Sequence, residues 1–159
     1  MITPDTRPTT VGFDSDEIDT SAPTRAARLK WVIAVDSSLP PGRAVNAAIC
    51  AAASTGLSVP GLLGPEVVDG AGSSHPGLPW AGCSILGGTT EQLAALRLKA
   101  VAGDTVFVAD MPVPAQHTLV YDEYRSQVES SPDLAYYAVS IVGPKNRVDK
   151  LTKGLTLLP

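Results

Sequence analysis

The polar side chains that could support chemistry are few, and the most informative pair is a cation and a carboxylate. Arg43 opens an alanine-rich segment that predicts a helix, and Asp110 ends an apolar run that predicts a strand. A cation at a helix N-terminus opposite a carboxylate at a strand end could bind an anion or polarise an ester carbonyl. Open α/β sheets also bind ligands beyond the carboxyl ends of their strands. The plainer alternative is a salt bridge between Arg43 and Asp110 that only holds two loops together.

The sequence contains two histidines, His75 and His117, and histidine is the side chain that most readily exchanges a proton near neutral pH. His117 follows Asp110 in a Pro-rich loop, so it could act as a general base that Asp110 orients. We therefore take Arg43, Asp110 and His117 as the candidate catalytic residues. The candidate substrate-binding residues are Asn46, Thr118 and His75. The alternative for each histidine is an exposed loop residue without a chemical role.

Several catalytic and cofactor-binding patterns are absent from the sequence. There is no Gly-x-Ser-x-Gly turn for a serine nucleophile, no Gly-rich phosphate loop, and no Cys/His spacing typical of zinc. The sequence therefore predicts neither a cofactor nor a metal site. Cys50 and Cys83 stand in apolar surroundings and are predicted to be inert core residues.

The elements that must position these residues begin with a strand and a helix. Residues 30–36 (KWVIAVD) form an apolar, β-branched run that predicts a central strand buried on both faces. After a Pro-Pro-Gly loop, residues 43–55 predict a helix that ends at Gly56. Apolar residues recur along this helix with helical spacing, which predicts the face that packs on the sheet. These residues are Val45, Ala48, Ile49 and Ala52.

The rest of the chain alternates strands and helices. Thr89 and Gln92 fit a capping box for a helix that runs to Ala102. Its predicted apolar stripe is Leu93, Leu96, Ala100 and Val101. Further helices are predicted over 120–130 and 145–153, strands over 66–69, 80–86, 105–110 and 136–142, and a turn at Gly143-Pro144. This order predicts an α/β fold: a three-layer α/β/α sandwich around a small mixed sheet of four main strands.

The charge is unevenly distributed along the 159 residues, which carry a formal net charge of -4. Residues 1–24 contain five acids and one base, so the acidity lies there and the remainder is neutral. We expect residues 1–24 to form a flexible acidic extension, with Val11 and Phe13 as docking residues, and residues 25–159 to form one domain. A neutral domain disfavours nucleic acid as a partner but allows a local basic site.

Basic residues nevertheless gather at two places. They could contact phosphates, or they could lie on a solvated surface where they complement a helix dipole. One cluster precedes the first strand and the other occupies the last helix. The residues are Arg25, Arg28 and Lys30, then Lys145, Arg147, Lys150 and Lys153.

Charge is scarce between residues 44 and 90, where Glu66 and Asp69 are the only ionised side chains. Low charge predicts a homodimer interface in the Ala-, Gly- and Pro-rich region 44–80. The longest uncharged run is broken by glycines, prolines and polar residues, so it does not predict a membrane span. The first residues contain no apolar leader segment, and we expect a soluble, cytoplasmic protein.

Several segments resemble known families. KWVIAVDSSLPPGRAVNAAICAAAS is similar to the first strand, loop and helix of type II peptidyl-tRNA hydrolases, and AYYAVSIVGPKNRVDKLTKGLTLLP resembles their last strand, turn, helix and tail. LLGPEVVD, HPGLPW, YDEYRSQV and VGPKNRVDKLTKGL more closely resemble an uncharacterised family, the domain of unknown function numbered 2000. The resemblance implies a type II peptidyl-tRNA hydrolase-like fold over most of residues 30–159.

The match to the hydrolases is poor at the groups that carry their chemistry. Asp110 and Thr118 match the loop aspartate and threonine of the hydrolases. Arg43 stands where they have a helix lysine, Ala47 where they have a glutamine, and Cys50 where they have a histidine. The resemblance therefore implies a diverged protein that acts as a binding or regulatory module. The alternative is a hydrolase that cleaves an ester or amide of a peptidyl-tRNA-like or small anionic substrate in the Arg43/Asp110 cleft.

Overall fold

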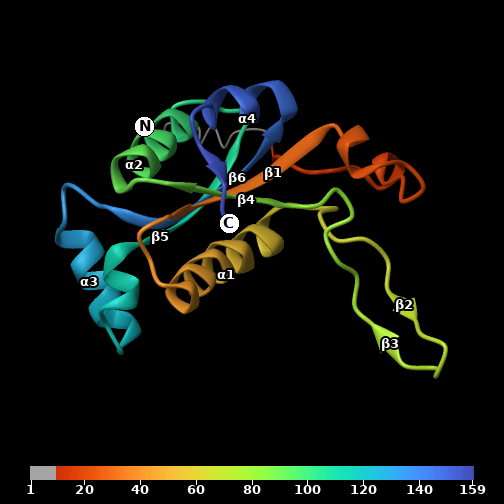
Figure 1. The fold of residues 1–159 in the computed structure, drawn as a ribbon, viewed down its shortest axis with the longest axis horizontal. Helices are drawn as coiled ribbons and strands as arrows, with labels where there is room; N and C mark the ends of the chain where they lie inside the picture. The colour runs from red at the N-terminus through yellow and green to blue at the C-terminus, as the bar shows by residue number, and fades with distance from the viewer. Residues whose placement is uncertain (1–9) are drawn as a thin grey trace, which may run out of the picture.

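The computed structural model describes residues 10–159, and its centre is a mixed five-stranded sheet in the order β5-β6-β1-β4-β7 (Figure 1). The strands are β1 (Leu29–Asp36), β4 (Ser84–Gly88), β5 (Phe107–Pro112), β6 (Tyr136–Pro144) and β7 (Thr156–Leu157). β1 and β4 run parallel, and the other neighbours are antiparallel. The predicted α/β fold with a mixed sheet is confirmed, but the sheet has five strands and not four. β7 escapes prediction because two residues are too short to show a periodic pattern.

Four α-helices are present in residues 10–159: α1 (Pro41–Ser58), α2 (Thr90–Val101), α3 (Tyr121–Ser130) and α4 (Lys145–Leu151). α1 packs on β5 and β6 from one face of the sheet, and α2 and α4 pack on β6 from the other face (Figure 1). A 3-10 helix, η3 (Val113–Gln116), leads from β5 to α3. None of the helices in this part of the chain has the length and apolar character needed to cross a membrane.

β1 is the central strand because its side chains are apolar on both faces. Successive side chains of a strand point to opposite faces. Ile33 and Val35 pack on the α1 side, while Val32 and Ala34 pack on the α2 side. Every residue of β1 except Lys30 is buried, as the sequence predicts. The enclosed strand fixes the position of the loop that leads into α1.

The packed face of α1 differs from the prediction. Val45 and Ile49 were expected to pack on the sheet but are 57% and 60% exposed. Small side chains let the helix backbone approach the sheet closely, and the larger side chains then point away from it. The helix also continues past Gly56 to Ser58, so Gly56 does not end it. The buried residues of α1 are Ala44, Ala47, Ala51 and Thr55.

The predicted capping box of α2 is confirmed. Thr89 Oγ1 accepts a hydrogen bond of 3.1 Å from the backbone N–H of Gln92, and Gln92 Oε1 accepts one of 2.9 Å from the backbone N–H of Thr89. Val101, predicted to be part of the apolar stripe, is 46% exposed. The remaining stripe residues are buried as predicted: Leu93, Leu96 and Ala100.

Several strand boundaries differ from the prediction, and β5 covers Phe107–Pro112 instead of residues 105–110, so Asp110 does not end it. β4 begins at Ser84 and not at residue 80. Gly143 and Pro144 do not form a turn but continue β6, where they pair with Lys30 and Leu29 of β1. Proline is tolerated at a strand end because it needs no ladder hydrogen bond from its nitrogen there. The long β6 strand therefore spans the whole length of β1.

A two-stranded hairpin, β2 (Val67–Val68) with β3 (Ser74–His75), projects from the body of the molecule (Figure 1). At its base, which we call the neck, the backbones of Gly64 and Gly77 lie in close contact. A Cβ atom at residue 77 would overlap the carbonyl oxygen of Gly64. Gly64 also donates a backbone hydrogen bond of 2.8 Å to Leu78. Position 77 therefore accepts only glycine without a shift of the backbone.

The segment before β1 docks on the domain through an aromatic contact. Phe13 is 5% exposed, and its ring centre lies 4.8 Å from that of Trp80. Val11 packs against the same core cluster. The predicted docking of Val11 and Phe13 is confirmed. Residues 1–9 of the predicted acidic extension lie outside the described residues.

An ion pair holds two short 3-10 helices, η1 (Ser15–Glu17) and η2 (Thr24–Ala26), close to the start of β1. Arg28 Nε donates to Glu17 Oε1 at 2.5 Å, and Arg28 also donates to the backbone carbonyl of Gly12 at 2.8 Å. The hydrogen bond from Arg28 lowers the pKa of Glu17 to about 2. The segment is therefore held by charge as well as by Phe13.

A buried chain of hydrogen bonds links the sheet to α1. Trp31 Nε1 donates to Ser140 Oγ at 2.8 Å, and Ser140 Oγ lies 2.7 Å from Thr55 Oγ1. Thr55 donates its own proton to the carbonyl of Ala51 at 2.8 Å, so Ser140 is the donor to Thr55. The chain satisfies each buried polar group and joins β1, β6 and α1.

Candidate functional site

One end of the sheet gathers most of the candidate residues. β5 runs in the same direction as β1, since both strands are antiparallel to β6. The end of β5 therefore lies at the same edge as the end of β1 and the start of α1. A groove of about 550 Å³ opens there between α1, the end of β5 and α3. Asn46, Asp110 and Thr118 all line it.

Arg43 lies in the first turn of α1, beside this groove. Its Nε donates to Gln116 Oε1 at 2.9 Å, and its Nη2 lies 3.4 Å from His117 Nε2. The guanidinium carbon is 5.4 Å from the ring centre of Tyr137, a cation–π distance. Among residues 10–159, no carboxylate lies at salt-bridge distance from Arg43. Arg43 is therefore a positive charge with neutral hydrogen-bond partners.

Gln116 is a central residue of the site that the sequence argument misses. Its Nε2 donates to the backbone carbonyl of Arg43 at 2.9 Å and to Asn46 Oδ1 at 3.1 Å. Together with its contact to Arg43 Nε, the amide fixes the first turn of α1 against η3. The signal in the sequence is the position of Gln116 directly before His117 in the Pro-rich loop.

His117 is paired with a second residue that the sequence does not reveal, Tyr137 of β6. His117 Nε2 lies 2.9 Å from Tyr137 Oη, and the two ring centres are 5.9 Å apart. When the imidazole is neutral with its proton on Nδ1, Nε2 accepts from the tyrosine hydroxyl. The structure therefore brings Arg43 and His117 together, with Tyr137 orienting the imidazole where Asp110 was expected to do so.

Asp110 has a different partner from the predicted one. Arg97 of α2 donates from Nε to Asp110 Oδ2 at 2.7 Å. This hydrogen bond raises the pKa of Arg97, and the Arg97 guanidinium also lies 5.1 Å from the ring centre of Tyr136. Within the described residues Asp110 forms no hydrogen bond with Arg43 or His117. The alternative that Arg43 and Asp110 form a salt bridge is therefore wrong.

The remaining candidates are placed as follows. Thr118 donates from Oγ1 to the carbonyl of Pro114 at 3.1 Å, which closes the turn after η3. His75 is not brought to the site: it lies on the hairpin, 3.0 Å from Asp69, and this contact lowers the pKa of Asp69. Cys50 is exposed and lines the groove, in contrast to the expected core position.

The comparisons with known proteins identify a family. A family model described as a protein of unknown function (DUF2000) matches residues 29–159. The chain belongs to this family. The range matched by DUF2000 begins with β1 and includes Arg43, Asp110, Gln116 and Tyr137. The curated proteins contain no match to the chain.

The fold of this DUF2000 protein is similar to a solved structure from Agrobacterium tumefaciens, which is that of a protein of unknown function. The two chains share 20% sequence identity, and the TM-score is 0.70. The match covers 82% of this chain and 97% of the other. At this level of identity the likeness concerns the fold alone.

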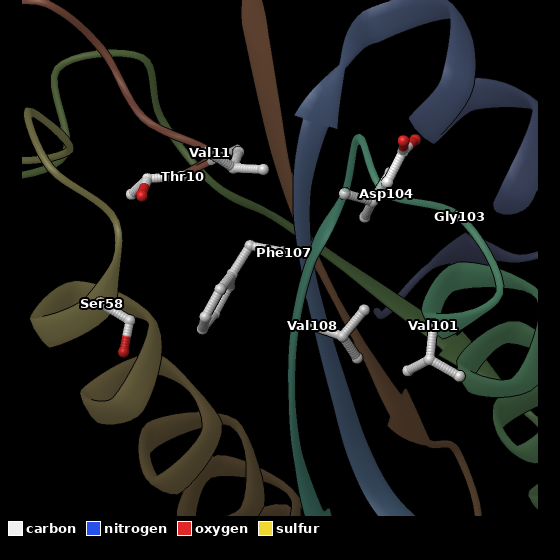
Figure 2. Close-up of a pocket in the computed structure, with 9 residues that line it drawn as sticks. Thr10, Val11, Ser58, Val101, Gly103, Asp104, Phe107 and Val108 are labelled. Carbon is white, nitrogen blue, oxygen red and sulfur yellow. The ribbon is translucent and has the colours of Figure 1, made fainter. Parts of the chain in front are cut away.

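A second hollow, of about 320 Å³, lies at the outer edge of β5 (Figure 2). Phe107 points toward α1, while Val108 points toward α2 on the other side of the strand. Asp104 is the one charged side chain among the described residues of its lining. Among the described residues, its lining offers the hydroxyl groups of Thr10 and Ser58 and this carboxylate but no cation or imidazole, in contrast to the groove beside Arg43.

The donors of the candidate site suit an anion better than a metal. In the part of the chain that the structure describes, no three His, Cys, Asp or Glu side chains lie close enough to hold a metal ion. Arg43 and the imidazole of His117 present nitrogen atoms to a ligand. The negative charge of Asp110, which could attract a metal ion, is neutralised by Arg97. Charge-assisted hydrogen bonds from a guanidinium are the strongest polar contacts available here. That the protein uses no cofactor stays a prediction.

Proposed function

We propose that this DUF2000 protein is a binding module that holds a small anionic ligand at Arg43. The observation that carries the proposal is the contrast between two arginines at this end of the sheet. Arg97 is paired with Asp110 at 2.7 Å, whereas Arg43 has no carboxylate at salt-bridge distance among residues 10–159. A guanidinium with neutral neighbours keeps its charge available for a ligand.

The neighbours of Arg43 determine which edge of its guanidinium group a ligand would contact. Gln116 occupies Nε and His117 lies next to Nη2, while Nη1 has no hydrogen-bond partner among the described residues. Nη1 can therefore donate to a carboxylate or phosphate oxygen. The N-terminal end of α1 carries a partial positive charge that adds to this attraction.

The groove beside Arg43 has room for the rest of the ligand. Its volume of about 550 Å³ lies in the range of small-molecule sites. Leu119 and Tyr124 supply apolar surface, and burial raises the pKa of Tyr124, so its phenol stays neutral and can donate a hydrogen bond. A ligand with an anionic group and an aromatic or apolar body fits this combination.

Titration calorimetry with phenyl phosphate, which carries both features, tests the proposal. Arg43→Gln should weaken binding by about tenfold or more, because it removes the charge that meets the anion. Arg125→Gln is the matched control, since Arg125 is an exposed arginine of α3 that lies 3.4 Å from Asp122. Equal affinities of the wild type and Arg43→Gln would overturn the proposal.

A second candidate is hydrolysis of an ester or amide, supported by the contact of His117 with Tyr137 at 2.9 Å beside Arg43. His117 would accept a proton from the water that attacks the carbonyl carbon, and Arg43 would stabilise the negative oxygen that forms there. The C–O or C–N bond would then break, and His117 would return the proton to the leaving alcohol or amine. Water would first have to replace Tyr137 at Nε2. This requirement places hydrolysis second to binding.

Turnover of peptidyl-tRNA and of p-nitrophenyl acetate separates the two candidates. A binding module should turn over neither substrate faster than buffer. Turnover that is lost in Arg43→Ala and in His117→Gln, but kept in Arg125→Ala, would replace the binding module by a hydrolase.

We also propose the finer fold class, a type II peptidyl-tRNA hydrolase-like sandwich. The order of the matching segments over residues 30–159 supports it. A tRNA substrate is disfavoured, because Ala47 and Cys50 stand where the hydrolases have glutamine and histidine. A regulatory role, a cytoplasmic location and the division into residues 1–24 and 25–159 stay predictions.

We propose further that two copies of the chain pair through the low-charge region. Val45, Ile49 and Leu57 lie exposed along α1, with Leu57 at 90% exposure. Val67 and Val68 of the hairpin are also exposed. An exposed patch of large apolar side chains on a folded protein is typical of an interaction site. Light scattering at tens of micromolar tests the pairing, and a monomeric mass would contradict it.

A further inference from the structure

A third hollow lies at the opposite end of the sheet from the groove, at the start of β1 and β4. Its volume is about 390 Å³. Three basic side chains line it, and each comes from a different element: Arg25 from η2, Lys30 from β1 and Lys145 from α4. These residues belong to the two basic clusters of the sequence, which lie far apart along the chain and meet here in space.

We propose that this hollow binds the phosphate group of a small phosphorylated molecule. Its described lining contains three cations and no acidic residue, in a protein whose formal net charge is -4. Charges of one sign repel each other, so an anion bound between these cations would relieve their repulsion. The proposal concerns different residues from those at Arg43, and neither proposal depends on the other.

The three cations are held in place by different contacts. Lys145 donates from Nζ to the backbone carbonyl of Arg25, which anchors η2 to α4. Lys30 donates from Nζ to Asp149 Oδ1 at 2.6 Å, so its charge is shared with that carboxylate. Arg25 has no acidic partner at salt-bridge distance among residues 10–159. Arg25 and Lys145 are therefore the two charges available to a phosphate.

The rest of the hollow is neutral and partly polar. Thr24 and Ser84 contribute hydroxyl groups that can donate to phosphate oxygens. Burial raises the pKa of the Cys83 thiol to about 12, so no thiolate forms beside the cations at neutral pH. Trp31 lies in the lining and is 7% exposed, with its indole N–H already bonded to Ser140. The lining thus offers positive charge and hydroxyls to an anion, and the nearby carboxylate of Asp149 lies outside the lining, paired with Lys30.

A small ligand fits this hollow better than a nucleic acid does. The volume of about 390 Å³ suits a phosphorylated small molecule. A nucleic acid needs an extended basic surface and, for single strands, exposed aromatic rings on which bases stack. Here Trp31 is buried, and the carboxylates of Asp149 and Glu17 lie beside Lys30 and Arg28. These acids interrupt the positive surface around the hollow.

Two-dimensional NMR with inorganic phosphate as the probe tests the proposal in the full chain. The backbone amide signals of Gly82, Cys83 and Ser84 should shift and saturate as phosphate is added at constant ionic strength. Arg25→Gln should weaken this binding by about fivefold or more and leaves the backbone carbonyl that holds Lys145 in place. Lys145→Arg should retain binding, because it keeps the charge at that position.

Lys153→Gln is the matched control, since Lys153 is an exposed lysine that follows α4 and lies outside the hollow. It should bind phosphate as the wild type does, and so should Arg43→Gln, which distinguishes this site from the one proposed at Arg43. Shifts that do not saturate, or that weaken equally in Lys153→Gln and Arg25→Gln, would overturn the proposal. Tighter binding of a tRNA, with shifts that spread to Lys150 and Lys153, would show a nucleic-acid surface instead.

Discussion

Arg97 donates a hydrogen bond of 2.7 Å from Nε to Asp110 Oδ2, and this pair joins α2 to β5. The carboxylate is 18% exposed and the guanidinium 36% exposed, so the pair is only partly screened by water. Because Asp110 pairs with Arg97, it is not a partner of Arg43 or His117. Among the described residues, the charge of Arg43 stays uncompensated, so the two arginines at this end of the sheet have different partners.

Asp110→Asn should lower the free energy of unfolding by about 1 kcal/mol, because it removes a partly exposed ion pair. Anion binding at Arg43 should not weaken, since Asp110 does not contact that residue and its replacement removes a negative charge from the groove. Urea denaturation and calorimetry with phenyl phosphate measure the two effects. A double-mutant cycle with Arg97→Met should give a coupling energy of about 1 kcal/mol; independent effects of the two substitutions would contradict the pairing.

Gln116→Glu should abolish the anion binding proposed at Arg43. The substitution places a carboxylate where the amide oxygen now lies, 2.9 Å from Arg43 Nε. An internal ion pair would then compete with the ligand, and affinity should fall by about tenfold or more. Gln127→Glu adds the same charge on α3 and serves as the control. The prediction fails if both variants bind phenyl phosphate as the wild type does.

Ser140→Ala should destabilise the fold by about 1–3 kcal/mol, because it leaves the buried indole N–H of Trp31 without an acceptor and removes the donor to Thr55. Ser140 and Thr55 are both fully buried. Urea unfolding followed by tryptophan fluorescence measures the change. Ser126→Ala, at an exposed position of α3, should alter stability by less than about 0.5 kcal/mol. Similar values for the two variants would show that the buried chain contributes little.

Acid should weaken the contact between η1 and Arg28. The pKa of Glu17 is lowered from 4.5 to about 2 in the folded protein, so its contribution to stability is fully present above pH 4.5. That contribution is lost as the pH falls through about 2, when the carboxylate becomes protonated. The unfolding free energy of the wild type should therefore fall more steeply below pH 4.5 than that of Glu17→Gln. Glu123→Gln, on exposed α3, should follow the wild type, and identical curves for all three proteins would refute the prediction.

The helix α1 shows why the order of elements was predictable while one packed face was not. Apolar runs located β1, α1, α2 and β6 to within a few residues, because these signals are local. Along α1, however, alanines occupy both faces, and after Arg43 no charged residue marks the solvent side. The sequence pattern predicts a core position for Val45 and Ile49, because these two larger residues are the more hydrophobic. Because the backbone of α1 lies close to the sheet, the alanines are buried there instead.

The candidate site shows the same division between local and distant signals. Arg43 and Asn46 lie on one helix, and Asp110 lies two residues before the end of β5, so the sequence could place them near one edge. Gln116 and Tyr137 could not be found in this way, because their contacts to Arg43 and His117 join separate elements of the sheet and its loops. The partner of Asp110 was missed for the same reason: Arg97 reaches it from α2, on the other face of the sheet.

The close contact of Gly64 with Gly77 at the neck has a consequence for how the length of the hairpin can change. The two backbones meet there without side chains between them, and the sheet beyond continues from Ser84. Residues added at the tip, around Gly70 and Gly72, would lengthen the arm without altering the register of any strand in the main sheet. A side chain at residue 77 would instead push the two legs of the arm apart. The hairpin is thus a modular extension, whose reach can vary while its attachment stays fixed.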